Sequence, residues 1–138
     1  MRRRPIPTET TAPPAPASPL LAEKRSMALT KAVVRVAGQL GLAQAELGRV
    51  MGVSPSTVSR MFKQEWLIPE KDKTWELAAL LVRIFRSLDA LVGGNAEHVR
   101  AWFQADNAHL GGAPAKLVFK VEGLTRVAGY LDAVRGAA

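Results

Sequence analysis

Apolar residues recur at intervals of three and four along most of the chain, the spacing of helices with one buried face. A clean apolar stripe over 29–40 predicts a first helix that ends before Gly41, with Ser18 and Ser26 as alternative N-caps. The longest predicted helix covers 72–92 and is apolar over more than half of its circumference. Such a helix lies at the centre of a fold or across a dimer interface.

The C-terminal third predicts three further helical segments. Asn95 is a suitable N-cap for a short helix that carries Trp102 and Phe103 in its core face, and Pro114 begins a single helical turn. The final helix has one apolar face, formed by Leu124, Val127, Ala128, Leu131 and Val134. No stretch shows the two-residue alternation of a half-buried strand, so the predicted fold is all-α.

Residues 44–63 predict two short helices joined by a tight turn. Gly52 can adopt the positive φ angle that such a turn needs, and Ser54 followed by a proline is a strong helix start. The inner face of the pair is formed by Leu47, Val50, Met51, Val58 and either Met61 or Phe62. Trp66 and Leu67 are expected to seal the base of this bundle. The pattern is typical of a helix-turn-helix, although an αα-hairpin used only for packing has the same outline.

The second short helix has an outward face without an acidic residue. Hydroxyl and cationic side chains on such a face suit the major groove of DNA, where they meet base edges and phosphates. We expect Ser56, Thr57 and Arg60 to face base edges or nearby phosphates. Gln44, at the start of the first short helix, and Lys63 are expected to contact phosphates.

Charge is unevenly distributed along the chain, whose net charge is +7. Residues 1–66 hold ten basic and four acidic residues, whereas residues 67–138 hold nine and eight. The excess of positive charge therefore lies in the half that contains the two short helices, as binding to phosphates requires. Residues 1–22 are predicted to form a disordered tail, because they hold six of the nine prolines and few residues to bury. A solvated tail is favoured over a DNA-binding arm built on Arg2, Arg3 and Arg4.

Groups that could perform chemistry are sparse. There is no cysteine, and His98 and His109 lie in different predicted elements without a close pair of carboxylates, so no metal site and no cofactor are expected. The stretch Leu110-Gly111-Gly112 lacks the lysine and the following helix of a P-loop, and no serine has a nearby histidine to activate it. No apolar run reaches the ~18 residues of a membrane span. We therefore expect a cytoplasmic protein that is not an enzyme and has no membrane partner.

The pair of short helices resembles the helix-turn-helix of the Xre (Cro/repressor) family. Seven residues stand where that motif requires them: Gln44, Leu47, Gly52, Val53, Ser54, Val58 and Ser59. Two positions differ, since Gly48 replaces the usual alanine and Ala43 replaces the usual Ser or Thr N-cap. Each change costs about 1 kcal/mol of helix stability, and neither removes a group that contacts DNA.

The C-terminal part resembles the Xre/MbcA/ParS antitoxins, which join a helix-turn-helix to a small helical toxin-binding domain. The residues that carry this resemblance are Ala101, Trp102, Asn107, Leu110, Gly111, Gly112, Pro114, Leu117, Gly123, Val127 and Leu131. The resemblance implies an antitoxin of a type II toxin–antitoxin system, which binds and neutralises a RES-type, NAD-consuming toxin. It also implies repression of the system's own promoter through binding to double-stranded DNA.

Contacts with the toxin are expected on the polar side of the final helix. Arg126, Tyr130 and Arg135 lie away from its apolar stripe, and Tyr and Arg are residue types that anchor interfaces. The alternative for these three residues is an ordinary solvated helix face. The stretch 110–114 is expected to form a corner between two helices rather than to touch the toxin.

The predicted organisation has three parts: a disordered tail (1–22), a helix-turn-helix domain (23–69), and a helical dimerisation and toxin-binding domain (70–138). A homodimer is expected, because a single helix-turn-helix binds weakly and a two-fold operator presents two half-sites. Residues 72–92 and the C-terminal helices are expected to form it. Two other functions remain open, namely a stand-alone Xre/Cro-type transcriptional repressor and a pure protein-interaction module with a vestigial helix-turn-helix.

Overall fold

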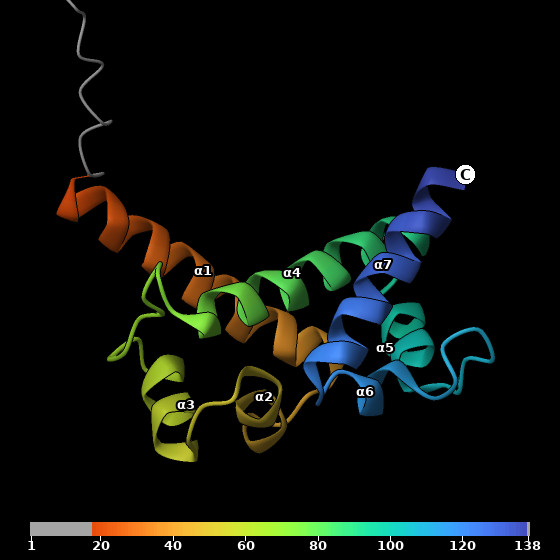
Figure 1. Ribbon diagram of the computed structural model, residues 1–138, viewed down its shortest axis with the longest axis horizontal. Coiled ribbons are helices and arrows are strands. Elements are labelled where there is room, and N and C mark those ends of the chain that lie inside the picture. The colour runs from red at the N-terminus through yellow and green to blue at the C-terminus, as the bar shows by residue number, and fades with distance from the viewer. Residues whose placement is uncertain (1–17, 138) are drawn as a thin grey trace, which may run out of the picture.

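The computed structural model describes residues 18–137 (Figure 1). Seven α-helices form the regular secondary structure of this range, and its one β-bridge joins Asn107 to Gly112. The all-α prediction is therefore confirmed. The predicted tail lies outside the described residues as far as position 17. Its prediction is wrong for residues 19–22, which form the first turn of α1.

The helix α1 (Pro19–Leu40) begins at the earlier of the two alternative caps. Ser18 Oγ accepts a hydrogen bond from the backbone N–H of Leu21 at 3.2 Å, and the following proline occupies the first helical position, where no N–H is needed. The helix ends where predicted, because Gly41 adopts a φ of +78° that breaks the helical path. Ser26, the other alternative, is a buried residue inside the helix.

Two short helices, α2 (Gln44–Met51) and α3 (Pro55–Phe62), lie together at the base of the molecule as drawn in Figure 1. Their apolar faces pack together and against α1 and α4. Of the two alternatives for the last inward residue, Met61 is fully buried, whereas Phe62 is 36% exposed. The predicted pair of helices is therefore present, with Met61 in the core.

The helix α4 (Lys73–Leu91) runs through the middle of the fold. It packs against α1 on one side and α7 (Val121–Ala137) on the other, and it also touches α5 (Ala96–Gln104). The one-turn helix α6 (Pro114–Leu117) lies between α5 and α7 in the chain. The buried apolar residues of α4 are Leu77, Ala78, Leu81, Val82, Ile84 and Leu88. Most of the apolar surface of α4 is thus buried against other helices of the same chain.

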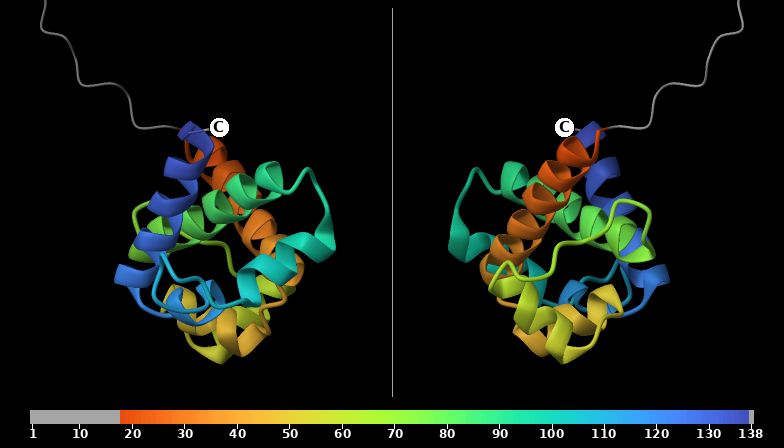
Figure 2. Two further views of the ribbon diagram at one scale, coloured as in Figure 1. Left: turned by 90° about the vertical axis from the view of Figure 1, so that its right-hand side faces the viewer. Right: turned by 90° about the vertical axis from the view of Figure 1, so that its left-hand side faces the viewer.

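One continuous hydrophobic core joins the two short helices to the C-terminal helices. Leu47 of α2, Ile84 of α4, Phe103 of α5 and Leu131 of α7 all have no solvent exposure. Burying a side chain of this size contributes about 1.5–3 kcal/mol relative to leaving it in water. This core holds α2 and α3 at one end of the molecule, while the start of α1 and the end of α7 lie at the opposite end (Figure 2).

A buried hydrogen bond joins the segment between α3 and α4 to α1. Thr30 Oγ1 accepts from the backbone N–H of Ile68 at 3.0 Å and donates to the carbonyl oxygen of Ser26 at 2.6 Å. Ile68 is fully buried, whereas Trp66 and Leu67 are half-buried. Trp66 packs against the core, as predicted for the base of the bundle, but the fully buried residue is Ile68, which the prediction did not include.

Replacing Thr30 with valine is expected to lower the free energy of unfolding by about 1–2 kcal/mol, because the buried N–H of Ile68 would lose its acceptor. Thr30→Ser keeps the hydroxyl and is the matched control, with a smaller expected loss. Urea denaturation followed by tryptophan fluorescence measures both variants. A larger loss from Thr30→Ser than from Thr30→Val would show that the methyl group, and not the hydroxyl, is what stabilises this position.

Candidate DNA- and toxin-binding sites

The turn between α2 and α3 brings the two helices into close contact. Gly52 has a φ of +69°, as the sequence predicts for this turn. Gly48 is buried against the turn, where a Cβ atom would lie 3.0 Å from the carbonyl oxygen of Val53. Ser54 then caps α3 by accepting a hydrogen bond from the N–H of Thr57 at 3.2 Å. The glycine at position 48 therefore allows a closer crossing than the usual alanine would.

The outward face of α3 presents the predicted DNA contacts. Ser56, Arg60 and Lys63 are exposed, and Thr57 is half-buried. The hydroxyls of Ser56 and Thr57 each lie 3.0 Å from Ser54 Oγ, so they form a hydrogen-bonded cluster at the start of the helix. Within the described part of the chain, the side chains of Arg60 and Lys63 form no ion pair. Both cations are therefore open to a ligand on this face.

Gln44 is exposed at the first position of α2. Ala43 has no side-chain oxygen to cap this helix, but its own backbone N–H donates to Glu46 Oε1 at 2.9 Å. This bond is one half of a capping box and offsets part of the cost of the missing hydroxyl. Gln44 therefore lies at a helix N-terminus whose N–H groups lack a side-chain acceptor, which favours a nearby phosphate.

Two cationic residues that the sequence analysis did not select adjoin this face. Lys31 and Arg35 are exposed on α1, four residues apart, so they share one side of the helix. Both line a groove of about 370 Å³ beside the end of α3, with Val34, Met61, Phe62 and Gln64. The sequence does indicate that both side chains face away from the core, since neither belongs to the apolar stripe of 29–40.

Two of the three predicted toxin contacts come together on α7. Tyr130 is half-buried, and its ring stacks with those of Trp102 and His109 at centroid distances of 6.3 and 6.0 Å. One turn earlier, Arg126 donates to the carbonyl oxygen of Leu110 at 3.4 Å. Both side chains therefore brace the loop that follows α5, and Tyr130 is not part of an ordinary solvated helix face.

The loop after α5 is a hydrogen-bonded corner. Asn107 Oδ1 accepts from the N–H groups of His109 at 2.9 Å and Leu110 at 3.2 Å, and the Asn107 carbonyl oxygen accepts from Gly111 at 2.9 Å. Gly111 has a φ of +78°, and Pro114 is buried where the chain enters α6. The conformation of this loop supports the expected role of these residues in shaping the domain.

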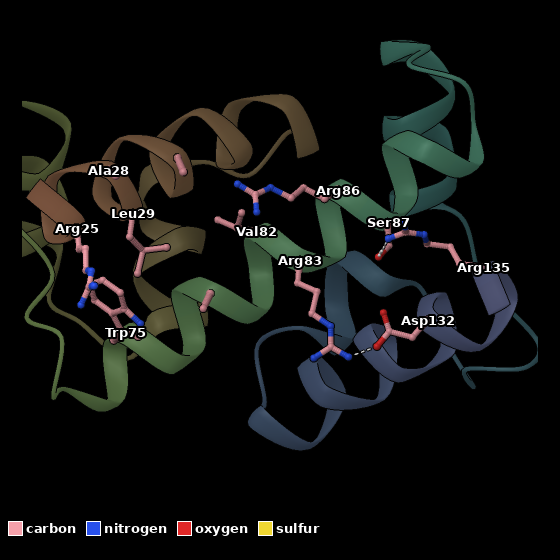
Figure 3. Close-up of a pocket in the computed structure, with 12 residues that line it drawn as sticks. Arg25, Ala28, Leu29, Trp75, Val82, Arg83, Arg86, Ser87, Asp132 and Arg135 are labelled. Atoms are coloured by element: carbon pink, nitrogen blue, oxygen red, sulfur yellow. Dashed lines mark hydrogen bonds and ion pairs between the residues drawn. The ribbon is translucent and has the colours of Figure 1, made fainter. Parts of the chain in front are cut away.

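Arg135, the third predicted toxin contact, lies on a different side of α7. Its guanidinium donates to Ser87 Oγ of α4 at 3.3 Å, at one end of the groove shown in Figure 3. Five residues separate it from Tyr130, so at 3.6 residues per turn the two side chains leave the helix in directions about 140° apart. The structure therefore does not bring the three predicted toxin contacts into one patch.

Metal-binding side chains are not clustered in the described part of the chain. Between residues 18 and 137, no group of three or more His, Cys, Asp or Glu side chains is placed to hold a metal ion. His109 instead stacks on Tyr130 in the corner after α5. No helix of the same range has the length and apolar character needed to cross a bilayer.

Comparison with protein-family models identifies both parts of the chain. Residues 19–83 match the antitoxin Xre-like helix-turn-helix domain, and residues 87–136 match the antitoxin Xre/MbcA/ParS C-terminal toxin-binding domain. The chain belongs to the Xre-type antitoxins. Both resemblances inferred from the sequence are thereby confirmed, in the predicted order. A comparison with curated proteins finds no significant match.

This Xre-type antitoxin carries a DNA-binding and a toxin-binding domain, and both families are regulatory rather than enzymatic. The two matched segments meet inside α4, between positions 83 and 87, so this helix contributes to both. The predicted domain boundary at residue 69 stays a prediction. A second link joins the segments, because Cζ of Arg49 on α2 lies 4.0 Å from the ring centroid of Phe119, a cation–π distance.

Proposed function

We propose that this antitoxin neutralises a RES-type, NAD-consuming toxin through its C-terminal domain and represses its own promoter through α2 and α3. The observation that carries the proposal is the combination, in one chain with one core, of an antitoxin helix-turn-helix and a toxin-binding domain. The RES type is supported by the sequence pattern of Trp102, Asn107, Leu110, Gly111, Gly112 and Pro114.

In this proposal α3 enters the major groove of double-stranded promoter DNA. Ser56, Thr57 and Arg60 face base edges or nearby phosphates, and Gln44 and Lys63 contact phosphates. All of these residues except the half-buried Thr57 are exposed, and α2 and α3 lie at the end of the molecule away from the start of α1 and the end of α7, which supports this assignment. A bidentate contact between an arginine and a guanine contributes about 1–3 kcal/mol of discrimination, so Arg60 is the residue of this set with the largest expected effect.

A homodimer is proposed because one helix-turn-helix occupies one half-site of a two-fold operator. The N-terminal half of α1 exposes a set of apolar side chains that a second copy could cover: Leu20, Leu21 and Met27. Residues 72–92 are less suitable than the sequence pattern suggests, because α4 buries most of its apolar residues between α1 and α7. We therefore place the dimer contact on α1.

The toxin is proposed to contact α7 at two separate places. Arg126 and the half-buried Tyr130 form one contact beside the corner after α5. Arg135 belongs to a second contact near α4, since it projects from another side of the helix. A toxin that touches both must wrap around α7 rather than cover a single face.

Co-expression with the protein encoded by the neighbouring gene tests the proposed function. We expect that protein alone to arrest growth and deplete cellular NAD, and we expect the antitoxin to co-purify with it and restore both growth and NAD. Growth arrest without loss of NAD would show that the toxin is not of the RES type. No partner, but specific binding to the upstream DNA, would leave a stand-alone repressor.

A further inference from the structure

A groove of about 550 Å³ lies between α1, α4 and α7 (Figure 3). Half of its lining residues belong to α4, and the others belong to α1 and to the C-terminal half of α7. The start of α1 and the end of α7 lie at the end of the molecule opposite α2 and α3 (Figures 1 and 2). Its apolar lining consists of Ala28, Leu29, Ala32, Trp75, Ala79 and Val82. This groove is thus an apolar surface that is separate from the DNA-binding face.

The rim of the groove is strongly basic. It holds four arginines and a single acidic residue, namely Arg25, Arg83, Arg86, Arg135 and Asp132. Three of the arginines have partners within the chain, because Arg83 pairs with Asp132, Arg135 donates to a serine of α4, and Arg25 lies 3.7 Å from a glutamate. Arg86 is exposed and extends between α4 and α1, and it forms no ion pair with another described residue.

We propose that this groove docks an acidic segment of the toxin, with carboxylates on the arginine rim and an apolar side chain against Trp75 and its neighbours. The inference rests on the proposed toxin neutralisation and extends it. Most of the groove belongs to α1 and α4, within residues 19–83, the part that matches the helix-turn-helix domain rather than the toxin-binding domain. The toxin would therefore contact both family-matched segments of the antitoxin. Arg135 would belong both to this groove and to the second toxin contact on α7.

Charge decides between the occupants that an apolar groove could accept. A second copy of this chain is proposed to contact Leu20, Leu21 and Met27, none of which lines the groove. In the groove itself, a chain of net charge +7 would meet a rim with a net charge of +3, and like charges across an interface are repulsive. Residues 1–17 carry three arginines and one glutamate, so they meet the same repulsion. DNA would meet an apolar floor on the side of the molecule opposite α3. An acidic protein segment complements both the floor and the rim.

Arg86 and Ala79 allow the two components of the groove to be tested separately. Arg86→Glu reverses the unpaired charge, and Ala79→Trp fills the floor from an exposed position of α4. Each is expected to weaken binding to the protein encoded by the neighbouring gene at least ten-fold. The new glutamate would replace an arginine anchor and repel the carboxylates of the acidic segment, and the new indole would occupy the space of its apolar side chain. Lys71→Glu and Ala90→Trp are the matched controls, since both residues are exposed and lie outside the groove.

Titration calorimetry of the full-length antitoxin with that protein measures these affinities. Wild-type affinity is expected to fall with added salt, and Arg86→Glu is expected to flatten this dependence. In Arg86→Lys, a carbodiimide is expected to join the new amine to an Asp or Glu of the toxin. All groove variants are expected to melt like the wild type and to keep operator binding.

Wild-type affinity in both groove variants would overturn the inference while leaving toxin neutralisation in place. Weakened operator binding with unchanged toxin binding would also overturn it and would assign the groove to DNA. A groove variant that elutes as a smaller species on gel filtration, with unchanged toxin affinity, would assign the groove to a second copy. Failure of the wild type to bind the neighbouring gene product at all would overturn the proposed function itself.

Discussion

Arg60→Ala is expected to abolish specific operator binding while leaving toxin neutralisation intact. Arg60 is exposed on α3 and forms no ion pair within the described residues, so its truncation removes the proposed DNA contact without disturbing the fold. A lost base contact costs about 1–3 kcal/mol, and the proposed dimer would lose it at both half-sites. Fluorescence anisotropy with labelled promoter DNA at fixed salt measures the affinity, and the growth assay measures neutralisation.

Lys71→Ala is the control for the loss of one positive charge. Lys71 is exposed and lies outside α2, α3 and the proposed dimer contact on α1, so operator affinity is expected to stay near that of the wild type. If neutralisation fell together with DNA binding in Arg60→Ala, the two activities would not be separated between the two ends of the molecule. If operator affinity were unchanged in Arg60→Ala, α3 would not be the helix that recognises the DNA sequence.

Gly123→Ala is expected to destabilise the toxin-binding part by at least ~3 kcal/mol, a loss typical of severe overpacking. Gly123 is buried in the first turn of α7, where a Cβ atom would overlap the carbonyl oxygen of Leu117 and lie 2.7 Å from its carbonyl carbon. Because these are backbone atoms, α6 and α7 would have to move apart. Thermal denaturation measures the effect, with an expected fall in Tm of roughly 10 °C.

Gly129→Ala, in the same helix, is the matched control. Gly129 is exposed, and no atom lies within 4 Å of the position that its Cβ would occupy. The substitution is expected to raise the free energy of unfolding by up to ~1 kcal/mol, because alanine has the higher helix propensity. Similar melting temperatures for both variants would mean that α6 and α7 are not packed as closely as Gly123 implies. Co-purification with the toxin is expected to be lost in Gly123→Ala alone.

Several boundaries of the fold were predictable because local interactions set them. Ser18 accepts its hydrogen bond from a residue three positions away, and Gly41 and Gly52 adopt positive φ angles that other residues adopt at a cost. Ser54 caps α3 in the same local way. In each case the groups that determine the boundary lie within a few residues of it, so the sequence pattern contains the necessary information.

The candidate sites were predictable to a smaller extent. The outward position of Ser56, Arg60 and Lys63 follows from the helical period of α3 alone. Period alone did not place Tyr130, which lies off the apolar stripe of α7 but stacks with Trp102 and His109 from other elements. The helical period predicts which residues share a face, but it does not predict which side chains from other elements pack against that face.

The sequence by itself determined the all-α class, the position of the helix-turn-helix, the family, and the outward residues of α3. Each of these rests on short-range spacing or on residues matched one by one. The tertiary structure alone decided that Ile68 enters the core, that Arg135 is separated from Arg126 and Tyr130, and that arginines from α1, α4 and α7 surround one groove. Those outcomes depend on the packing of helices far apart in the chain, whose angles and distances are set by the whole core.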